Sequence, residues 1–240
     1  MENRYTQEYI VLPGLCDSSG ALGIPDTFLL FMDLAAIHAE LLHVDTPRLM
    51  KRNLFWLTVR TRVRFSRRPM MAERVTLTTW PETPGKLRAD RSYTIERNGE
   101  RIISGKTEWT ILETDTGKLH PMAGIFPSDF AFHPDTVWPE PFTRIKDEPL
   151  EDYARYTVRS TDIDIGGHMN NAAYLRALAG TFSTEQWQGM NIRELEIAFR
   201  SPCYEGDTLI WQQRSDGDAL SLRAALANGK TIALARIIKG

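Results

Sequence analysis

The stretch Ser160-Thr-Asp-Ile-Asp-Ile-Gly-Gly-His-Met-Asn-Asn-Ala-Ala-Tyr-Leu175 places many reactive side chains next to one another. Two carboxylates, one imidazole and two carboxamides surround a Gly-Gly pair, directly before an apolar run that is typical of a helix. Because glycine accepts backbone angles that strain other residues, these polar groups are expected to share one tight turn. A turn needs no histidine, so the pairing of Asp164 with His168 indicates chemistry at the start of this helix.

This stretch is one half of an internal repeat. Each half of the chain has a glycine turn, an apolar helix, a strand ending in Arg/Ser-rich sequence with proline, and an Asn-Gly hairpin. In the first half these features are Gly20, residues 25–42, residues 56–69 and Asn98-Gly99. In the second half they are Gly166-Gly167, residues 172–186, residues 193–202 and Asn228-Gly229. Asn-Gly favours the two positive φ angles of a tight hairpin, so each half is predicted to be one helix followed by antiparallel strands.

The first half indicates how helix and sheet fit together. Residues 25–42 are apolar nearly all round, which predicts a buried helix. Leu57, Val59, Thr61, Val63 and Phe65 alternate with Thr58, Arg60, Arg62, Arg64 and Ser66, which predicts a strand with one face in solvent. A sheet wrapped on one long buried helix is the hotdog arrangement, and two copies give an α+β double hotdog. We expect an N-terminal hotdog repeat over residues 1–120, a stiff Pro-rich surface linker over 121–150 and a C-terminal hotdog repeat over 151–240.

The repeat and the quoted stretch together resemble the acyl-acyl carrier protein (acyl-ACP) thioesterase family, which has plant and bacterial members. The family motif reads roughly Asp-x-Asp-x-Asn-x-His-x-Asn-Asn, followed by an aromatic residue and Leu. It is matched here by Asp162, Asp164, His168, Asn170, Asn171, Tyr174 and Leu175, whereas Gly166 stands where the family usually has Asn. Residues 22–44, Thr79-Trp80, Asp90-Arg91, Trp109 and residues 195–209 also resemble family positions.

The resemblance implies a thioester hydrolase of fatty acid biosynthesis that releases free fatty acid from its carrier and needs no cofactor. Asp164 would be the base or the carboxylate that orients water, and His168 would position the thioester, with Asn170 in the same catalytic set. Backbone N–H groups at Gly166 and Gly167 would bind the substrate carbonyl. The first half would line the acyl slot, with candidate wall residues Phe28, Phe31, Met32 and Trp56.

Cys203 is a candidate nucleophile with His168 as its base. Plant members of the family have Glu-Cys after the corresponding strand, whereas this chain has Pro202-Cys203. Either Glu205 takes the place of that Glu, or the mechanism relies on Asp164 alone. The structural alternative is that Cys203 is a small hydrophobic residue at a strand end.

The other polar residues also have structural interpretations. Asp162 and Asp164 could be turn formers, and Asn171 is predicted to cap the following helix. The remaining histidines lack the spacing of metal ligands, so no metal site is predicted.

A basic segment suggests a partner. Between positions 51 and 74 there are eight basic residues and a single acid, Glu73, in a chain of net charge −2. Acyl carrier protein is strongly acidic, so Arg64, Arg67 and Arg68 are candidate carrier-docking residues. A solvated sheet face would have the same composition.

Composition excludes several other classes. A net charge of −2 argues against nucleic-acid binding, which needs surplus Lys and Arg. The longest apolar stretch, residues 28–37, is interrupted by Asp33 and is shorter than the ~20 residues of a membrane span. The first residues lack a signal-peptide pattern and the two cysteines form no CxxC pair, so a cytoplasmic location is expected. Whether two chains form a homodimer stays open.

Two alternatives to acyl-ACP hydrolysis remain. The same fold could act on acyl-CoA, because the fold does not fix the carrier. A catalytically weak hotdog that only binds acyl thioesters is the other alternative, and it is raised by Gly166 and Pro202.

Overall fold

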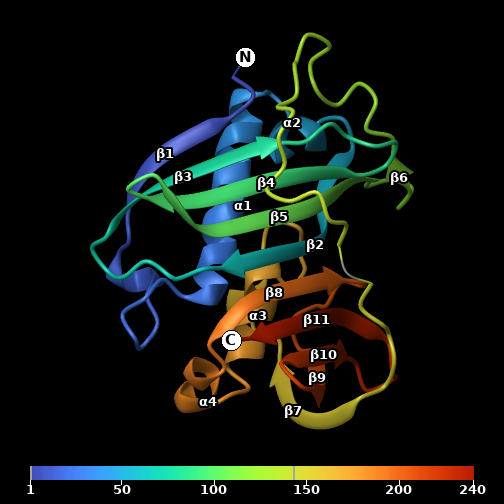
Figure 1. Ribbon diagram of the computed structural model, residues 1–240. Helices are drawn as coiled ribbons and strands as arrows, with labels where there is room; N and C mark the ends of the chain where they lie inside the picture. The colour runs from blue at the N-terminus through green and yellow to red at the C-terminus, as the bar shows by residue number, and fades with distance from the viewer. Residues whose placement is uncertain (1, 143) are drawn as a thin grey trace. The chain divides into compact units, whose positions relative to one another are not determined.

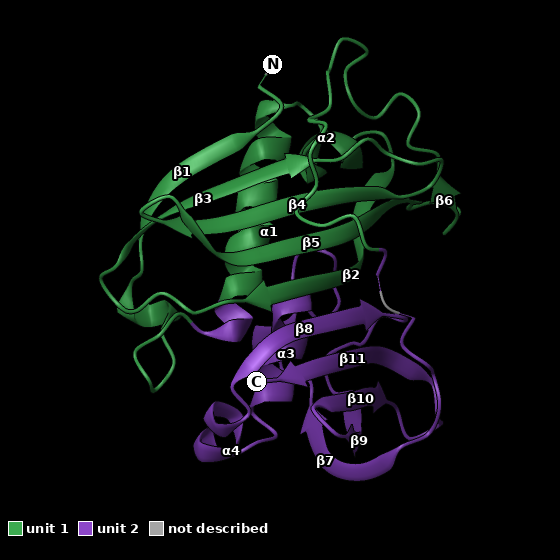
Figure 2. Cartoon of the chain, in the orientation of Figure 1, with its two compact units in different colours: residues 1–22, 27–140 green, residues 23–26, 141–240 purple. Residues whose placement is uncertain are grey.

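The computed structural model describes residues 2–142 and 144–240, and the chain divides into two units (Figures 1 and 2). Unit 1 extends to Leu22 and then from Thr27 to Glu140, and unit 2 comprises Gly23–Asp26 and Pro141–Gly240. No helix among the described residues is both long enough and apolar enough to cross a bilayer.

Unit 1 is an antiparallel sheet around one helix. Its strands lie in the order β1 (Tyr5–Ile10), β3 (Arg74–Pro81), β4 (Ala89–Arg97), β5 (Glu100–Glu113) and β2 (Leu54–Phe65), and the short β6 (Leu119–His120) pairs with β5. The helix α1 (Ile24–Leu41) packs on this sheet, and the short α2 (Thr46–Met50) follows it. The ring of Phe31 in α1 stacks on Tyr93 at 4.5 Å between centroids. A Cβ on Gly105 would lie 2.1 Å from the same ring, so this close approach of helix and strand requires glycine.

Unit 2 repeats the plan on a smaller scale. A 3₁₀ turn, η2 (Ser160–Asp162), follows β7 (Glu151–Thr157), and the sheet order is β8 (Ile192–Phe199), β11 (Thr231–Lys239), β10 (Ala219–Ala225), β9 (Thr208–Asp216) and β7. Tyr174 of α3 (Asn171–Ala179) packs on Phe199 of β8, with ring centroids 5.4 Å apart. Each unit is thus a sheet wrapped on one helix, and the predicted α+β double hotdog is confirmed.

The predicted single helix over residues 172–186 is wrong. The structure has α3, which ends at Ala179 with Gly180 as its C-cap, and a separate α4 (Thr184–Gly189). Ser183 begins α4 by accepting a hydrogen bond from the N–H of Gln186 at 3.1 Å. Gly180 and the Ser183 cap thus end one helix and begin another, although the apolar pattern of the sequence continues across them.

The two Asn-Gly pairs differ. Asn98 and Gly99 both have positive φ, 53° and 79°, and join β4 to β5 as a tight hairpin, as predicted. β10 and β11 also form the predicted hairpin, but only Gly229 has positive φ there. The Asn228 side chain instead accepts a hydrogen bond from the N–H of Lys230 at 3.0 Å.

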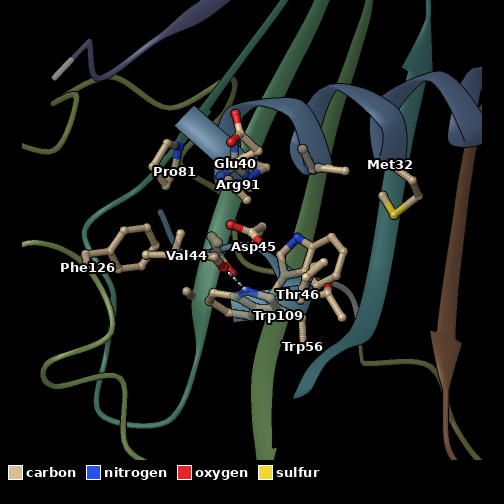
Figure 3. A pocket seen from close by; sticks show the side chains of 16 residues that line it. Met32, Glu40, Val44, Asp45, Thr46, Trp56, Pro81, Arg91, Trp109 and Phe126 are labelled. Carbon is tan, nitrogen blue, oxygen red and sulfur yellow. Dashed lines mark hydrogen bonds between the residues drawn. The ribbon is translucent and has the colours of Figure 1, made fainter. Parts of the chain in front are cut away.

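Unit 1 contains a cavity of about 310 Å³ between α1 and the sheet (Figure 3). Met32 and Ala35 of α1, Trp56 of β2, Trp109 of β5 and Phe126 form much of its apolar wall. The indole N–H of Trp56 donates to the carbonyl oxygen of Val44 at 2.7 Å, which fixes the orientation of this ring.

The outer face of the unit 1 sheet is partly covered, whereas a face in solvent was predicted. The pairing of β2 with β5 shifts between Thr58 and Arg60, so the alternation expected along residues 57–66 is interrupted. Further along, Arg62 is only 2% exposed and Lys106 only 5%.

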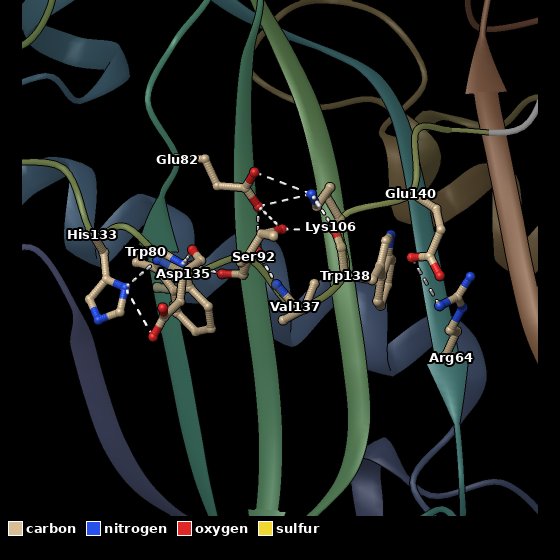
Figure 4. A network of polar contacts seen from close by, with 12 residues as sticks. Arg64, Trp80, Glu82, Ser92, Lys106, His133, Asp135, Val137, Trp138 and Glu140 are labelled. Atoms are coloured by element: carbon tan, nitrogen blue, oxygen red, sulfur yellow. Dashed lines mark hydrogen bonds and ion pairs between the residues drawn. The ribbon is translucent and has the colours of Figure 1, made fainter.

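Residues 133–140 lie across this face (Figure 4). The indole N–H of Trp80 donates to the carbonyl of Asp135 at 2.7 Å, and the Lys106 ammonium donates to the carbonyl of Trp138 at 3.0 Å. Met122, Ile125 and Phe130 belong to a buried apolar cluster of unit 1. Much of the segment expected to be a surface linker therefore packs into unit 1, while the boundaries 1–120, 121–150 and 151–240 stay a prediction.

Candidate active site

The turn between η2 and α3 is closed by its own backbone. The N–H of Asp164 donates to the carbonyl of His168 at 3.1 Å, and the N–H of Gly167 donates to the carbonyl of Asp164 at 2.9 Å. Gly167 has φ of 73°, which favours glycine there. Asp162 has a structural role, because its Oδ2 accepts from the Tyr156 hydroxyl at 2.7 Å and from the Arg159 N–H at 2.8 Å.

The carboxylate of Asp164 is oriented by two donors from the same turn. Its Oδ1 accepts from the N–H of Gly166 at 2.8 Å, and its Oδ2 accepts from the side-chain amide of Asn170 at 3.3 Å. No arginine or lysine forms an ion pair with it among residues 2–142 and 144–240. No cationic side chain of the described residues therefore lies against this carboxylate, which is partly buried.

The imidazole of His168 lies against the same turn. A Cβ placed on Gly166 would be 2.9 Å from His168 Nε2 and 3.0 Å from Asp164 Oδ1. His168 Nδ1 is 3.5 Å from the carbonyl oxygen of Met169, at the long limit of a hydrogen bond. The missing side chain at position 166 thus allows the imidazole and the carboxylate to approach the same point.

Asn170, not Asn171, caps α3, which corrects the prediction. Asn170 Oδ1 accepts from the N–H of Ala172 at 2.8 Å, and this contact directs the other end of the amide at Asp164. Asn171 is the first residue of the helix and makes no hydrogen bond through its N–H or its side-chain amide to any residue that the structure describes. Its N–H is a free donor at the positive end of α3.

The two glycines offer fewer donors than expected. The N–H of Gly166 and the N–H of Gly167 are both used inside the turn, on Asp164. In this conformation neither can bind a substrate carbonyl, so the roles predicted for Gly166 and Gly167 are better explained by the space and backbone angle that glycine permits.

Cys203 is fully buried and its thiol donates to Asp207 Oδ2 at 3.5 Å. Burial, together with the charge of Asp207, raises the pKa of this thiol to about 12. The nucleophilic form of cysteine is the thiolate, which this environment disfavours. Glu205, the candidate substitute for the absent glutamate, is exposed.

Unit 1 contains a second copy of this turn. The sequence predicted its glycine, Gly20, but not that Asp17 corresponds to Asp164. A hydrogen bond from the Asp17 N–H to the Ala21 carbonyl at 2.9 Å, and one from the Gly20 N–H to the Asp17 carbonyl at 2.9 Å, reproduce the closure around Asp164. Gly20 has φ of 77°. The signal was an Asp three residues before a glycine in both halves.

The two copies differ in the side chains around the carboxylate. Ala21 stands where unit 2 has His168, and Ser19 stands where it has Gly166. Arg68 forms an ion pair with Asp17. Although burial opposes its charge, hydrogen bonds from Ser19 and Arg68 hold the pKa of Asp17 below its usual value.

The counterpart of Arg68 in unit 2 is Pro202. The N–H of Leu22 donates to the carbonyl of Pro69, and the N–H of Met169 donates to the carbonyl of Cys203, both at 2.8 Å. These equivalent contacts align Pro69 with Cys203, and therefore align Arg68 with Pro202. The position that holds an arginine in unit 1 thus holds a proline in unit 2. The same geometry that neutralises Asp17 leaves Asp164 without a cation.

The residues predicted for the acyl slot separate into two groups. Met32 and Trp56 line the unit 1 cavity (Figure 3). Phe28 and Phe31 are buried in the core and are not among the residues that line it.

The three candidate docking arginines all have internal partners in unit 1. Arg67 pairs with Glu73 at 2.9 Å, Arg68 pairs with Asp17, and Arg64 lies 3.8 Å from Glu140 and stacks over Trp138 (Figure 4). Their positive charge is thus largely balanced locally.

Among the described residues, no group of three or more His, Cys, Asp or Glu is arranged to hold a metal ion.

Comparison with known proteins shows which proteins the chain is similar to. An oleoyl-acyl carrier protein thioesterase of Coriandrum sativum, described as chloroplastic, is 24% identical over 177 residues, which are 68% of this chain and 48% of that protein. The chain spans about half the length of the curated relatives it matches.

Two solved structures share the fold. An acyl-ACP thioesterase from Bacteroides thetaiotaomicron has a TM-score of 0.91 at 22% identity, covering 99% of this chain and 98% of that one. The 12:0-ACP thioesterase from Umbellularia californica has a TM-score of 0.85 at 17% identity, covering 99% and 97%. The family model of the acyl-ACP thioesterase N-terminal domain matches residues 2–126, and that of the C-terminal domain matches residues 146–238. With both models matched in order over most of its length, the chain belongs to the acyl-ACP thioesterase family.

Proposed function

We propose that this chain hydrolyses the thioester of fatty acyl-ACP to release a free fatty acid, with Asp164 and His168 as its catalytic pair. The observation that carries the proposal is the contrast between the two turns. One turn holds Asp17 beside an arginine and an alanine, whereas the other turn holds Asp164 beside an imidazole and no Arg or Lys side chain of the described residues. Membership of the thioesterase family supports the substrate class.

In the proposed reaction a water oxygen attacks the thioester carbonyl carbon while Asp164 accepts a proton from that water. The N–H of Gly166 and the amide of Asn170 hold the carboxylate in one orientation for this step. His168 and the free N–H of Asn171 stabilise the negative charge that develops on the carbonyl oxygen. The carbon–sulfur bond then breaks, and the departing thiolate takes up the proton.

Substitution of Asp164 tests the proposal. Asp164→Asn keeps the shape but removes the base, so kcat for acyl-ACP should fall by about 10²- to 10⁴-fold. His168→Ala should cost a similar factor, and the double variant should be little worse than either because the two groups act as one unit.

The matched control is Asp17→Asn, the same position in the turn of unit 1. Removing that charge leaves Arg68 without its partner and should lower stability, while kcat of the folded protein stays near the wild-type value. Full activity of Asp164→Asn would contradict the mechanism. An inactive wild type that binds acyl-ACP would favour the acyl-thioester-binding alternative.

The carrier preference and docking residues are part of the same proposal. Arg64→Glu with Arg67→Glu should raise KM for acyl-ACP, with an effect that shrinks as salt rises, and leave acyl-pantetheine unaffected. Arg68 is kept because it holds Asp17. Matched rates on acyl-CoA decide between the two carriers. A cytoplasmic location stays a prediction, and the question of a homodimer stays open.

A further inference from the structure

The unit 1 cavity contains a buried charge that no carboxylate balances. Arg91 of β4 lines the cavity and is 6% exposed. Its Nη1 lies 3.1 Å from Nδ1 of His38 and donates to the hydroxyl of Thr79 at 3.3 Å. No carboxylate lies within ion-pair distance of this guanidinium anywhere in residues 2–142 and 144–240. Arginine does not lose its proton in proteins, so the charge persists.

His38 neither balances the charge of Arg91 nor adds to it. Burial, reinforced by the charge of Arg91, lowers the pKa of His38 to about 4, so this imidazole is neutral at pH 7. Its Nε2 lies 3.2 Å from the carbonyl oxygen of Glu2 and donates to it, which leaves Nδ1 as the acceptor for Arg91.

The acidic residues around the cavity are engaged elsewhere. Asp45 and Glu40 both pair with Arg48. Asp90 also lines the cavity, but it precedes Arg91 in the strand, so its side chain points toward the opposite face of the sheet. There its charged neighbours are Glu82, Lys106, Glu108 and Arg60.

Much of the remaining wall of the cavity is apolar and aromatic, formed by Met32, Ala35, Trp56, Trp109 and Phe126 (Figure 3). A mainly apolar pocket that holds a cation without a carboxylate partner among the described residues suits a ligand that combines an aliphatic chain with one anionic group. Arginine offers a planar pair of donors that matches a carboxylate, and a buried cation is costly until it is paired.

We propose that the unit 1 cavity binds a carboxylate carried on an aliphatic chain, with Arg91 holding the carboxylate. Two sources have this chemistry, namely a free fatty acid and an acyl group whose far end carries a carboxylate. Where the proposed function holds, a fatty acid bound beside Met32 and Trp56 would also compete with the acyl chain of the substrate.

The test compares octanoate, dodecanoate and hexadecanoate with the corresponding alcohols by titration calorimetry, and by the fluorescence of Trp56 and Trp109. Wild type should prefer the carboxylate of matching length by about 10- to 100-fold, the range expected of a charge-assisted pair. Arg91→Met should remove this preference and leave alcohol binding nearly unchanged. Equal binding of acid and alcohol by wild type, or undiminished acid binding by Arg91→Met, would overturn the proposal.

Two further variants keep the test decisive. Arg223→Met removes an equally buried arginine of unit 2, one that is paired with Asp147 at 3.1 Å, and should leave fatty acid binding unchanged. If Arg91→Met fails to fold, Ala39→Leu narrows the cavity from α1 and should weaken acid and alcohol together. Acid binding that Ala39→Leu leaves intact would place the ligand elsewhere and overturn the proposal.

Hydrolysis separates the two sources. A higher kcat/KM for a thioester with a distal carboxylate than for its plain acyl counterpart would identify that acyl group as the ligand. Equal rates with preserved dodecanoate binding would identify the free fatty acid. Fatty acid binding in a protein that hydrolyses no thioester would sustain this inference while the proposed function fails.

Discussion

Gly166 limits which side chains fit beside the proposed catalytic pair, Asp164 and His168. Its φ lies outside the left-handed region, so the backbone there would accept alanine. The added Cβ would meet His168 Nε2 at 2.9 Å and Asp164 Oδ1 at 3.0 Å, contacts that only a displaced imidazole or carboxylate can relieve. A family-like Asn at this position would meet the same obstacle.

Gly166→Ala should therefore lower kcat by about 10- to 100-fold with little change in KM or in thermal stability, because misplacement of reacting groups costs rate more than folding energy. Steady-state kinetics with a melting curve provide the measurement. Gly189→Ala is the control, since a Cβ there meets nothing within 4 Å. Wild-type kcat in Gly166→Ala would mean that the observed position of His168 is unimportant for turnover.

The buried thiol of Cys203 predicts that hydrolysis does not use it. Cys203→Ala should keep kcat within about threefold of wild type, well short of the loss expected on removing a nucleophile. The variant should also lose some stability, because a buried side chain becomes smaller. Loss of activity in a folded Cys203→Ala protein would restore the thiolate mechanism.

At the residue scale the sequence predicted which residues meet in the turn but not the role of each one. Asp164, His168 and Asn170 do meet in one turn. Both Asn170 and Asn171 satisfy the pattern of a cap before an apolar run, and only the register of the turn selects Asn170. The role of Asp17 depends on Arg68, which is distant in sequence, so no local pattern could reveal it.

Among the elements, α1 and β5 show the tightest fit. Phe31 occupies the space over Gly105 that any other residue would fill. Gly105→Ala should destabilise the protein by about 1–3 kcal/mol, the usual cost of overpacking a core. Urea unfolding measures the loss, and adding Phe31→Leu should recover part of it.

The matched control for that substitution is Gly85→Ala, whose Cβ would meet only the carbonyl of Arg88 at an ordinary 3.7 Å. A Gly105→Ala protein as stable as this control would show that the helix can retreat from the strand without cost.

Elements marked by local chemistry were predictable, and those decided by distant packing were not. The Asn98-Gly99 hairpin needs only its own backbone angles. The outer face of β2 was expected in solvent because its arginines alternate with apolar residues, yet Trp138 and Glu140, which lie far along the chain, contact Arg64 on it. Position 180 is an exception, because Gly180 and the Ser183 cap are local signals, but the apolar pattern that continues across them favoured a single helix.

For the whole molecule, stability should depend on the ionisation of Asp90. Burial, with repulsion from Glu82, raises the pKa of this carboxyl to about 6 from an ordinary 3.8. The folded state thus holds the proton more tightly than the unfolded chain does. The associated stability is present at acid pH and is lost as pH rises through about 6.

Asp90→Asn cannot ionise and should escape this loss. Its stability relative to wild type should increase by roughly 1 kcal/mol between about pH 5 and pH 8, as measured by urea unfolding. Asp216→Asn, at an exposed position, is the control. A pH-independent difference for Asp90→Asn would mean that the carboxyl titrates normally in the folded protein.

The two matching turns have a consequence for stoichiometry. One chain has two copies of a single turn but one proposed catalytic pair, so a non-hydrolysable substrate analogue should bind at one equivalent per chain. The copy that lacks the histidine pairs its aspartate, Asp17, with Arg68. Building a second pair there would require the exchanges Ser19→Gly, Ala21→His and Arg68→Pro, on a backbone that already has the same bends.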